Sequence, residues 1–280
     1  MSTNTIGVLL SNLNAYYNRS IWSGIEKIAK EQNINVLYFS GGLIENTDPY
    51  RVQSNIIYEF IDSNNVDGLI IVSGTIGVFI SHEKLNIFIN KYKSIPKVSI
   101  SVPFKNIPHV LIDNKNGMKK LIYHLINVHK YKKIAFIRGP EENHEAQIRF
   151  DAYKEVLNEF MIEYNPELVL QGNFTYEQAR EAVRILLDRN VEFEAVVAAN
   201  DDSALGVMDE LKERDINVPD EVAVTGFDDS ITSKASLPSI TTVKQPLFNL
   251  GKSAIEMLLA IINGEKKCDN KVLQLSLLHI

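Results

Sequence analysis

Short apolar runs alternate with stretches of helical period along the whole chain, and this alternation most constrains its fold. The runs are almost continuously apolar, which is typical of strands that are buried on both faces of a sheet. They comprise residues 5–11, 35–40, 67–73, 96–101, 108–113, 133–139, 167–172, 194–200 and 221–227. Repeated alternation of strand and helix predicts an α/β fold with parallel sheets that helices cover on both faces.

The segments between these runs carry the signals of helices. A single apolar stripe runs along the first helix and is formed by Ile21, Trp22, Ile25, Ile28 and Ala29. Further helices are predicted at 117–129, 144–162, 176–190 and 202–214, with a last one that begins near 247. Thr175, with Gln178 three residues later, predicts a capping box at the start of helix 176–190. Gly264 is expected to cap the end of the last helix.

Length and composition indicate a globular chain of two lobes. The chain has 280 residues, of which 45% are hydrophobic, and a chain of this length tends to divide into two domains of typical size. The net charge is −6, and the 29 lysines and arginines form no basic block. The electrostatic surface of a nucleic-acid-binding domain is therefore not expected.

The sequence also gives an expectation for the compartment. Cys268 is the single cysteine, which excludes an internal disulfide and suits a reducing environment. The run 5–11 has no basic segment before it and no cleavage site, and no run reaches transmembrane length. We therefore expect a cytoplasmic chain with no membrane partner, although a secreted protein whose signal had been removed would look the same.

Polar and aromatic side chains follow the predicted strands at their carboxyl ends, where parallel α/β sheets bind ligands. They are Asn12, Asn14, Tyr16, Tyr17, Ser73, Asp113, Arg149, Phe174, Asn200 and Asp228. The set offers hydrogen-bond acceptors, an arginine fork and aromatic faces, so it suits a polyhydroxylated ring such as a sugar, and a purine would fit nearly as well. The alternatives are a structural ion pair for Arg149 and a helix cap or salt bridge for Asp228.

The adjacent carboxylates of Asp228 and Asp229 raise the question of catalysis or metal binding. Neighbouring side chains of an extended strand point to opposite sides, so the two should not converge on one bond or one metal ion. We expect Asp228 to face a ligand, and Asp229 or Ser230 to cap the next helix. His124 and His129, five apart on a helix, lack the spacing of metal ligands, and no phosphate loop, GxGxxG or GxSxG motif is present. A binding module without cofactor or metal is favoured over an enzyme.

Two long motifs resemble the ligand-binding core of the LacI/GalR family of bacterial transcription regulators, which is itself similar to the periplasmic sugar-binding proteins. The motifs are "AVVAANDDSALGVMDELKERDINVPDEVAVTGFDDS" and "SITTVKQPLFNLGKSAIEMLLAIINGE". The segment "IDNKNGMKKLIYHLINVHKYKKIAFIRGP", followed by Arg149, is similar to the mid-chain segment of the same family. The resemblance covers nearly the whole chain.

The resemblance implies a periplasmic binding protein-like type I fold, with two Rossmann-like lobes joined by three crossings near residues 130, 241 and 264. The N-terminal lobe would comprise residues 1–129 and 242–263, and the C-terminal lobe residues 130–241 and 264–280. A ligand would bind in the cleft between the lobes, and lobe closure would be the signal. Because family members commonly dimerise, a homodimer is expected.

The resemblance also implies roles for single residues. Arg149, the arginine after "GP", would clamp the effector. Asp228, in "GFDD", would accept hydrogen bonds from the effector, and Asn200, in "ANDxxALG", would lie near it.

Further site residues come from loops that differ more among family members. Tyr16 and Tyr17 match the aromatic pair of the first loop, and Phe174 matches an aromatic of purine-responsive members. Asp113 is carried over from a loop that varies.

The resemblance leads to three functional hypotheses. The first strand begins near Thr5, which leaves no room before it for the family's helix-turn-helix. We expect the ligand-sensing domain of a LacI/GalR-type regulator that binds a small polar effector, a sugar or a nucleoside or purine, and that contacts DNA only through another domain. The stretches "IWSGI" and "YFSGG" are similar to a branch that precedes signalling modules, so the sensor of a diguanylate cyclase or histidine kinase is the alternative. A transport-type sugar-binding protein is the third hypothesis.

Overall fold

The computed structural model describes residues 4–45, 52–265 and 269–278, and the chain divides into two compact units. Unit 1 contains Met1–Ile112, Glu142–His144 and Pro246–Leu273, and unit 2 contains Asp113–Glu141, Glu145–Gln245 and Gln274–Ile280. Cys268 lies outside the described residues. Within the described part of the chain, no helix is long and apolar enough to cross a membrane.

A parallel sheet forms the centre of unit 1. Its described strands lie in the order β11-β5-β4-β3-β1-β2, and every neighbouring pair runs parallel. The strands are β1 (Thr5–Leu10), β2 (Asn35–Ser40), β3 (Gly68–Ile71), β4 (Lys97–Ile100), β5 (His109–Ile112) and β11 (Lys271–Leu273). The prediction of parallel strands from the first five apolar runs is confirmed, but β2 lies at the edge of the sheet and is not buried as expected, since Leu37 is 42% exposed.

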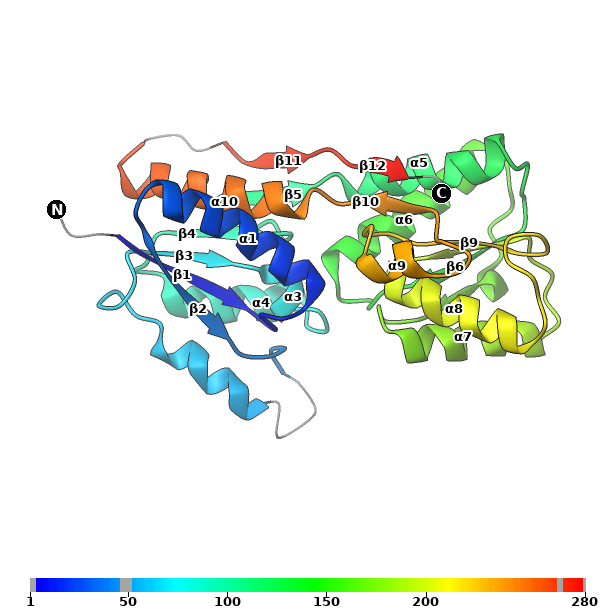
Figure 1. Ribbon diagram of the computed structural model, residues 1–280, viewed down its shortest axis with the longest axis horizontal. Helices are drawn as coiled ribbons and strands as arrows, with labels where there is room; N and C mark the ends of the chain where they lie inside the picture. Colours follow the sequence, from blue (N-terminus) through cyan, green and yellow to red (C-terminus); the bar gives the residue numbers. More distant parts are fainter. Residues whose placement is uncertain (1–3, 46–51, 266–268, 279–280) are drawn as a thin grey trace. The chain divides into compact units, whose positions relative to one another are not determined.

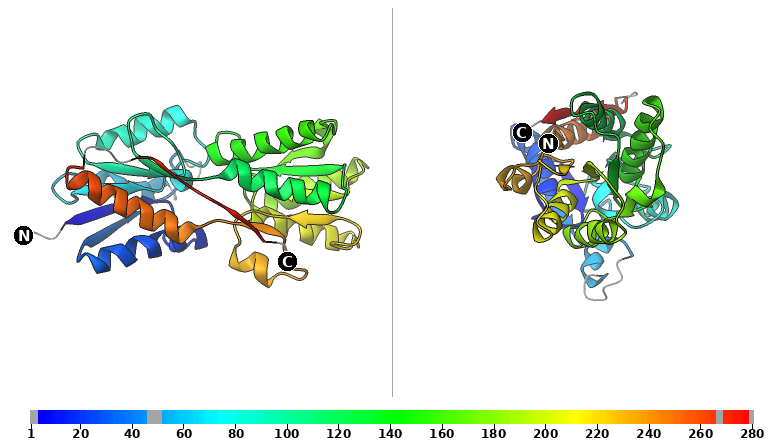
Figure 2. Two further views of the ribbon diagram at one scale, coloured as in Figure 1. Left: turned by 90° about the horizontal axis from the view of Figure 1, so that it is seen from above. Right: turned by 90° about the vertical axis from the view of Figure 1, so that its right-hand side faces the viewer.

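Two long helices of unit 1 pack against each other at very short distance. They are α1 (Tyr16–Glu31) and α10 (Leu247–Ile262), which lie side by side in Figures 1 and 2. A Cβ atom on Gly24 would lie 2.0 Å from the Phe248 carbonyl oxygen, and one on Gly251 would lie 1.8 Å from the Ile21 carbonyl oxygen. The two glycines therefore let the helix backbones touch. The remaining described elements of unit 1 are η1 (Ser54–Phe60), α3 (Ser73–Ile76), α4 (His82–Ile89) and η2 (Asn90–Tyr92).

Unit 2 is built around a second parallel sheet. Its described strands lie in the order β7-β6-β8-β9, and their apolar side chains form a buried core with the neighbouring helices. The strands are β6 (Ile134–Arg138), β7 (Val169–Gln171), β8 (Ala195–Ala198) and β9 (Ala223–Thr225). A separate antiparallel pair joins β10 (Thr242–Lys244) and β12 (Ser276–Leu278).

Helices cover both faces of the unit 2 sheet. In Figure 1, α5 (Asn114–Asn127) and α6 (His144–Glu159) lie above the strands, and α7 (Tyr176–Asp188) and α8 (Asp201–Glu213) lie below them. A 3-10 turn, η3 (Pro166–Leu168), precedes β7, and the short helix α9 (Ile231–Ala235) follows β9. Both sheets thus have the parallel α/β architecture that the alternation predicted.

The predicted helix ends are confirmed at two places. The Thr175 hydroxyl accepts a hydrogen bond from the Gln178 backbone N–H at 3.3 Å, so the start of α7 is capped, but the reciprocal bond of a capping box is not formed, because the Thr175 N–H donates to the Gly172 carbonyl at 3.0 Å. Gly264 follows α10 with a φ of +83° and donates its N–H to the Ile261 carbonyl at 3.0 Å. This left-handed position is one that glycine adopts at no steric cost.

The compact units divide at other residues than the resemblance implied. The first division falls before Asp113 instead of near residue 130, because α5 packs on β10 and β12 of unit 2. Two later divisions fall after Gln245 and after Leu273, instead of near 241 and 264, and the short segment Glu142–His144 within the span of unit 2 is also assigned to unit 1. The strand β11 therefore completes the sheet of unit 1 before the chain enters unit 2.

Candidate functional site

Arg149 is the centre of a polar cluster at the carboxyl ends of the unit 2 strands. It lies in the second turn of α6, and only 3% of its surface is exposed. Its Nε donates a hydrogen bond to Asn114 Oδ1 at 2.8 Å, and Nη1 donates to the Ala199 carbonyl at 2.7 Å. Among the described residues no carboxylate forms a salt bridge with Arg149, and these two bonds leave part of its five-donor fork unused.

Two aromatic rings hold the Arg149 guanidinium in place. Its central carbon lies 3.8 Å from the centroid of the Phe227 ring and 5.7 Å from that of Phe174. Stacking on an aromatic face stabilises a cation without using its N–H groups. The guanidinium is therefore fixed in position while some of its donors are available for another molecule.

Phe174 reaches the cluster through an unusual backbone conformation. Asn173 and Phe174 both have positive φ values, 51° and 63°, which turn the chain sharply after β7. The Phe174 ring lies so close to Gly139 that a Cβ there would approach it to 2.4 Å. Gly139 is thus needed for the close approach of the ring.

Asp228 follows Phe227 and presents a carboxylate near Arg149. Its backbone N–H donates to the Val243 carbonyl at 2.9 Å, and its Oδ1 accepts a hydrogen bond from Gln245 Nε2. Its Oδ2 accepts no hydrogen bond from the part of the chain that the structure describes. The cluster therefore combines unused donors of Arg149 with an unused acceptor of Asp228.

The surroundings of Asp228 disfavour its charged form. Burial raises the pKa of the carboxyl well above its usual range, and the nearby carboxylates of Asp201 and Asp202 raise it further. The Arg149 guanidinium and the Gln245 hydrogen bond act in the opposite direction but do not cancel the effect of burial.

Asp228→Asn should stabilise the ligand-free protein at neutral pH. The pKa of Asp228 in the folded protein lies above the unfolded value of about 3.9. The wild-type protein therefore loses free energy of unfolding as the pH rises from the unfolded pKa through the folded pKa. The amide keeps the acceptor for Gln245 and removes the disfavoured charge. We expect the melting temperature to exceed that of the wild type by about 2–4 °C at pH 7–8, or about 1 kcal/mol, and to converge with it as the pH falls toward 4. Thermal denaturation across this pH range measures the effect.

A matched control is Asp188→Asn, which removes an exposed carboxylate of the same unit. Its side chain is 60% exposed and pairs with Arg214 at 2.9 Å, and exposed pairs contribute little stability. The control should melt close to the wild type at every pH. A melting temperature of Asp228→Asn below that of the wild type at pH 7–8 would show that the charge is stabilising and would contradict the argument.

Asp228 and Asp229 do not form a pair, as predicted, but the reason is different from the one expected. The strand β9 ends at Thr225, and Asp228 and Asp229 have φ values of +144° and +61°, so a turn separates their side chains. The Asp229 carboxylate forms an ion pair with Lys234 at 2.8 Å. Ser230 caps α9 by accepting a hydrogen bond from Ser233 N–H at 3.1 Å, as one of the two predicted alternatives stated.

Asn200 and Asp113 act as helix caps in the structure. The Asn200 side chain accepts a hydrogen bond from Ser203 N–H at 3.0 Å and donates one to the Phe174 carbonyl at 3.1 Å. The Asp113 carboxylate accepts a hydrogen bond from Asn116 N–H at 3.2 Å and so begins α5 earlier than predicted. Asn200 fixes the segment that carries Phe174, whereas Asp113 stabilises a helix start.

Three of the predicted site residues belong to unit 1. Tyr16 is partly exposed at the start of α1, and the Tyr17 hydroxyl shares a hydrogen bond of 3.0 Å with the Ser101 hydroxyl. Ser73 is fully buried, and its hydroxyl shares a hydrogen bond of 2.8 Å with that of Ser99. These three lie near the carboxyl ends of unit 1 strands and remain predicted ligand contacts.

Sequence reasoning missed three members of the Arg149 cluster. Asn114 supplies an acceptor for Arg149, Phe227 its stacking face, and Gln245 a donor for Asp228. Phe227 stands inside the quoted "GFDD" motif, so its place beside Asp228 could have marked it as a residue of the site. Asn114 and Gln245 also stand inside quoted motifs, but they lie 35 and 17 residues from their partners, and no local pattern marks them as contacts of Arg149 and Asp228.

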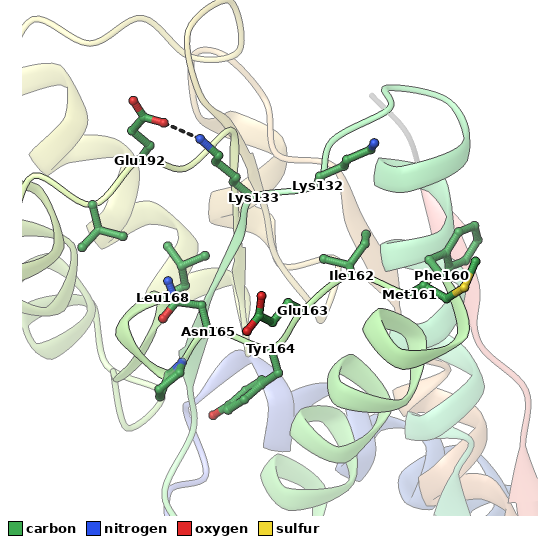
Figure 3. Close-up of a pocket in the computed structure, with 12 residues that line it drawn as sticks. Lys132, Lys133, Phe160, Met161, Ile162, Glu163, Tyr164, Asn165, Leu168 and Glu192 are labelled. Carbon is green, nitrogen blue, oxygen red and sulfur yellow. Dashed lines mark hydrogen bonds and ion pairs between the residues drawn. The ribbon is translucent and has the colours of Figure 1, made fainter.

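A cavity lies at the opposite, amino-terminal ends of the unit 2 strands. It has a volume of about 750 Å³ and is lined by Lys132, Lys133, Phe160, Met161, Ile162, Glu163, Tyr164, Asn165, Pro166, Leu168, Val191 and Glu192. Figure 3 shows Lys133 and Glu192 in an ion pair with each other. None of the predicted site residues lines this cavity, and ligands of parallel α/β sheets bind at the other edge.

Known regulators are similar to this chain over almost its full length. Catabolite control protein A of Priestia megaterium is 28% identical over 278 residues, which are 98% of this chain and 79% of the relative. Among solved structures, a complex of the transcriptional regulator CelR with cellobiose has a TM-score of 0.85 at 26% identity and covers 99% of this chain and 84% of that one. The transcription regulator CcpA of Lactococcus lactis has a TM-score of 0.84 at 26% identity, with 99% of this chain and 98% of that one covered.

A family model matches more than half of the chain. It describes the periplasmic binding protein-like domain and matches residues 122–279, which include Arg149, Phe174, Asn200 and Asp228. The parallel sheets of both units agree with this match. The chain belongs to the periplasmic binding protein-like domain family and is an effector-binding domain of the LacI/GalR type.

Proposed function

We propose that this chain is the sensing domain of a transcription regulator and that it binds a sugar through Arg149 and Asp228 of unit 2. The observation that carries the proposal is the cluster itself. A guanidinium fixed by two hydrogen bonds and the Phe227 ring lies near a carboxylate whose Oδ2 has no partner among the described residues.

The chemistry of the cluster favours a polyhydroxylated ligand. Each hydroxyl of a sugar both donates and accepts hydrogen bonds, so it can satisfy Arg149 donors and the Asp228 acceptor together. The Phe174 ring, which is partly exposed, offers an apolar face for the C–H side of a sugar ring. The relative CelR, whose solved complex contains cellobiose, supports a saccharide over a purine.

The mechanism of signalling is proposed by extension from the family. An effector that contacts Arg149 and Asp228 and also Tyr16, Tyr17 and Ser73 would favour a closed arrangement of the two lobes. A ligand shifts such an equilibrium only through its different affinity for the two forms. Small-angle scattering with and without the sugar would measure a decrease in the radius of gyration.

The proposal also covers the partners of the domain. We infer a cytoplasmic homodimer that catalyses no reaction and needs no cofactor, and the similar proteins CelR and CcpA are transcription regulators by name. Because the lysines and arginines form no basic block, DNA contact is assigned to a separate domain of the regulator.

A thermal-shift screen with mono- and disaccharides, nucleosides and purines tests the ligand class. Ligand binding increases the free energy of unfolding by mass action, by about 2.7 kcal/mol at a hundredfold excess over Kd, and this raises the melting temperature. We expect a saccharide to produce the largest shift in the wild type and a much smaller one in Asp228→Asn. A shift with purines alone would contradict the sugar assignment, and an equal shift in the variant would contradict the site.

A further inference from the structure

His124 and His129 face each other at the end of α5, although they are five residues apart. Their Nε2 atoms are 3.2 Å apart, and their rings are nearly perpendicular, with centroids 4.9 Å apart. The helix ends at Asn127, the Val128 N–H still donates to the His124 carbonyl at 2.9 Å, and His129 follows directly. Helical spacing alone would not have placed these two rings together.

The separation of the two nitrogens suits a shared metal ion. Two imidazoles that bind Zn²⁺ at about 2.0–2.1 Å in a tetrahedral arrangement hold their nitrogens about 3.4 Å apart. We propose that His124 and His129 bind one borderline transition-metal ion, such as Zn²⁺ or Cu²⁺, through their Nε2 atoms. Imidazole nitrogen is a favoured ligand of this class of ion.

The ligand set includes water. In the described part of the chain, no group of three or more His, Cys, Asp or Glu side chains could hold a metal, so the protein supplies two ligands. His124 and His129 line a cavity of about 500 Å³, together with Asp220, Ser239 and Thr225. Thr225 is 2% exposed, and its hydroxyl oxygen has no hydrogen-bond partner among the described residues. A buried hydroxyl in this state requires water or a ligand, which is consistent with water molecules that complete the metal coordination.

Neighbouring groups orient the two rings. The Tyr131 ring stacks on His129 at a centroid distance of 5.5 Å and an angle of 11°, and His124 is held by the last turn of α5. In the metal-free protein, one imidazole donates its Nε2–H to the Nε2 lone pair of the other. On metal binding that donor ring takes the tautomer with its proton on Nδ1, so both Nε2 lone pairs bind the ion and the net number of protons is unchanged.

Calorimetric titration of Zn²⁺ into the full chain without a histidine tag tests the proposal. We expect one site in the wild type, and a loss of affinity of about tenfold or more in both His124→Gln and His129→Gln, because each removes a direct ligand. The control is His82→Gln, since His82 lies in unit 1 and contacts the Pro103 carbonyl. This control should keep the wild-type Zn²⁺ affinity.

Electron paramagnetic resonance of bound Cu²⁺ provides a second measurement, because it counts the imidazole nitrogens coupled to the metal. This number would not change if the histidines had a purely structural role. Coupling to two imidazole nitrogens in the wild type, and to one in each variant, is expected. Zn²⁺ affinity unchanged in either variant, or Cu²⁺ coupling to a single nitrogen in the wild type, would overturn the proposal. Retained saccharide shifts in both variants would show that they are folded.

Discussion

Arg149→Ala is expected to weaken effector binding by about 2 kcal/mol or more, which is roughly a 30-fold loss of affinity. The variant removes a charge-assisted donor from the ligand, and such hydrogen bonds are among the stronger ones. It also leaves Asn114 Oδ1 and the Ala199 carbonyl without the donor that now satisfies them. Calorimetry with the saccharide that gives the largest thermal shift measures the loss.

Two further variants separate binding from stability. Arg149→Lys keeps the charge but cannot make both hydrogen bonds of the planar fork, so an affinity between those of the wild type and Arg149→Ala is expected. Arg180→Ala, on α7, breaks ion pairs with Glu210 and Glu213 and should leave the affinity unchanged. Unchanged affinity in Arg149→Ala would show that the guanidinium is only structural and that the site assignment is wrong.

Gly251→Ala is expected to destabilise unit 1 by about 3 kcal/mol or more. The added Cβ would lie 1.8 Å from the Ile21 carbonyl oxygen and 3.2 Å from the Ile25 nitrogen, so α1 and α10 must move apart. Overpacking costs about 1–3 kcal/mol, and contact with rigid backbone lies at the upper end or beyond. Chemical denaturation measures the free energy of unfolding.

The sign of this effect is informative because helix propensity acts in the opposite direction. Alanine is better than glycine inside a helix by about 0.8–1.0 kcal/mol, so a helix without the close contact would gain stability. Lys252→Ala, at the next and partly exposed position of α10, is the matched control and should change stability by less than about 0.5 kcal/mol. A stabilised Gly251→Ala would contradict the packing of α1 on α10.

The strands and helices could be predicted because their signals are local. Apolar runs and helical periodicity depend on neighbouring residues, and the capping signals of Thr175 and Gly264 lie within a few residues of the helix ends that they mark. The start of α5 was placed too late because "DNKN" carries no apolar residue, and the Asp113 cap replaces that signal.

The candidate site was only partly predictable because its contacts are long-range. Arg149 and Asp228 are predicted from their places after strands and from the family motifs, but the partners that fix them, Asn114 and Gln245, lie 35 and 17 residues away from them. The turn that separates Asp228 from Asp229 depends on positive φ values. Positive φ is uncommon for residues other than glycine, so the sequence does not predict this turn. The contact between His124 and His129 is likewise not contained in helical periodicity, because residues five apart do not share one face of a helix.

A crystal structure of the complex with the strongest saccharide ligand tests the central claim most directly. The expected result places ligand hydroxyls within about 3.2 Å of the Arg149 guanidinium nitrogens and of Asp228 Oδ2. A saccharide bound elsewhere, for example in the cavity beside Tyr164 and Lys132, with no polar contact to Arg149 or Asp228, would contradict the account.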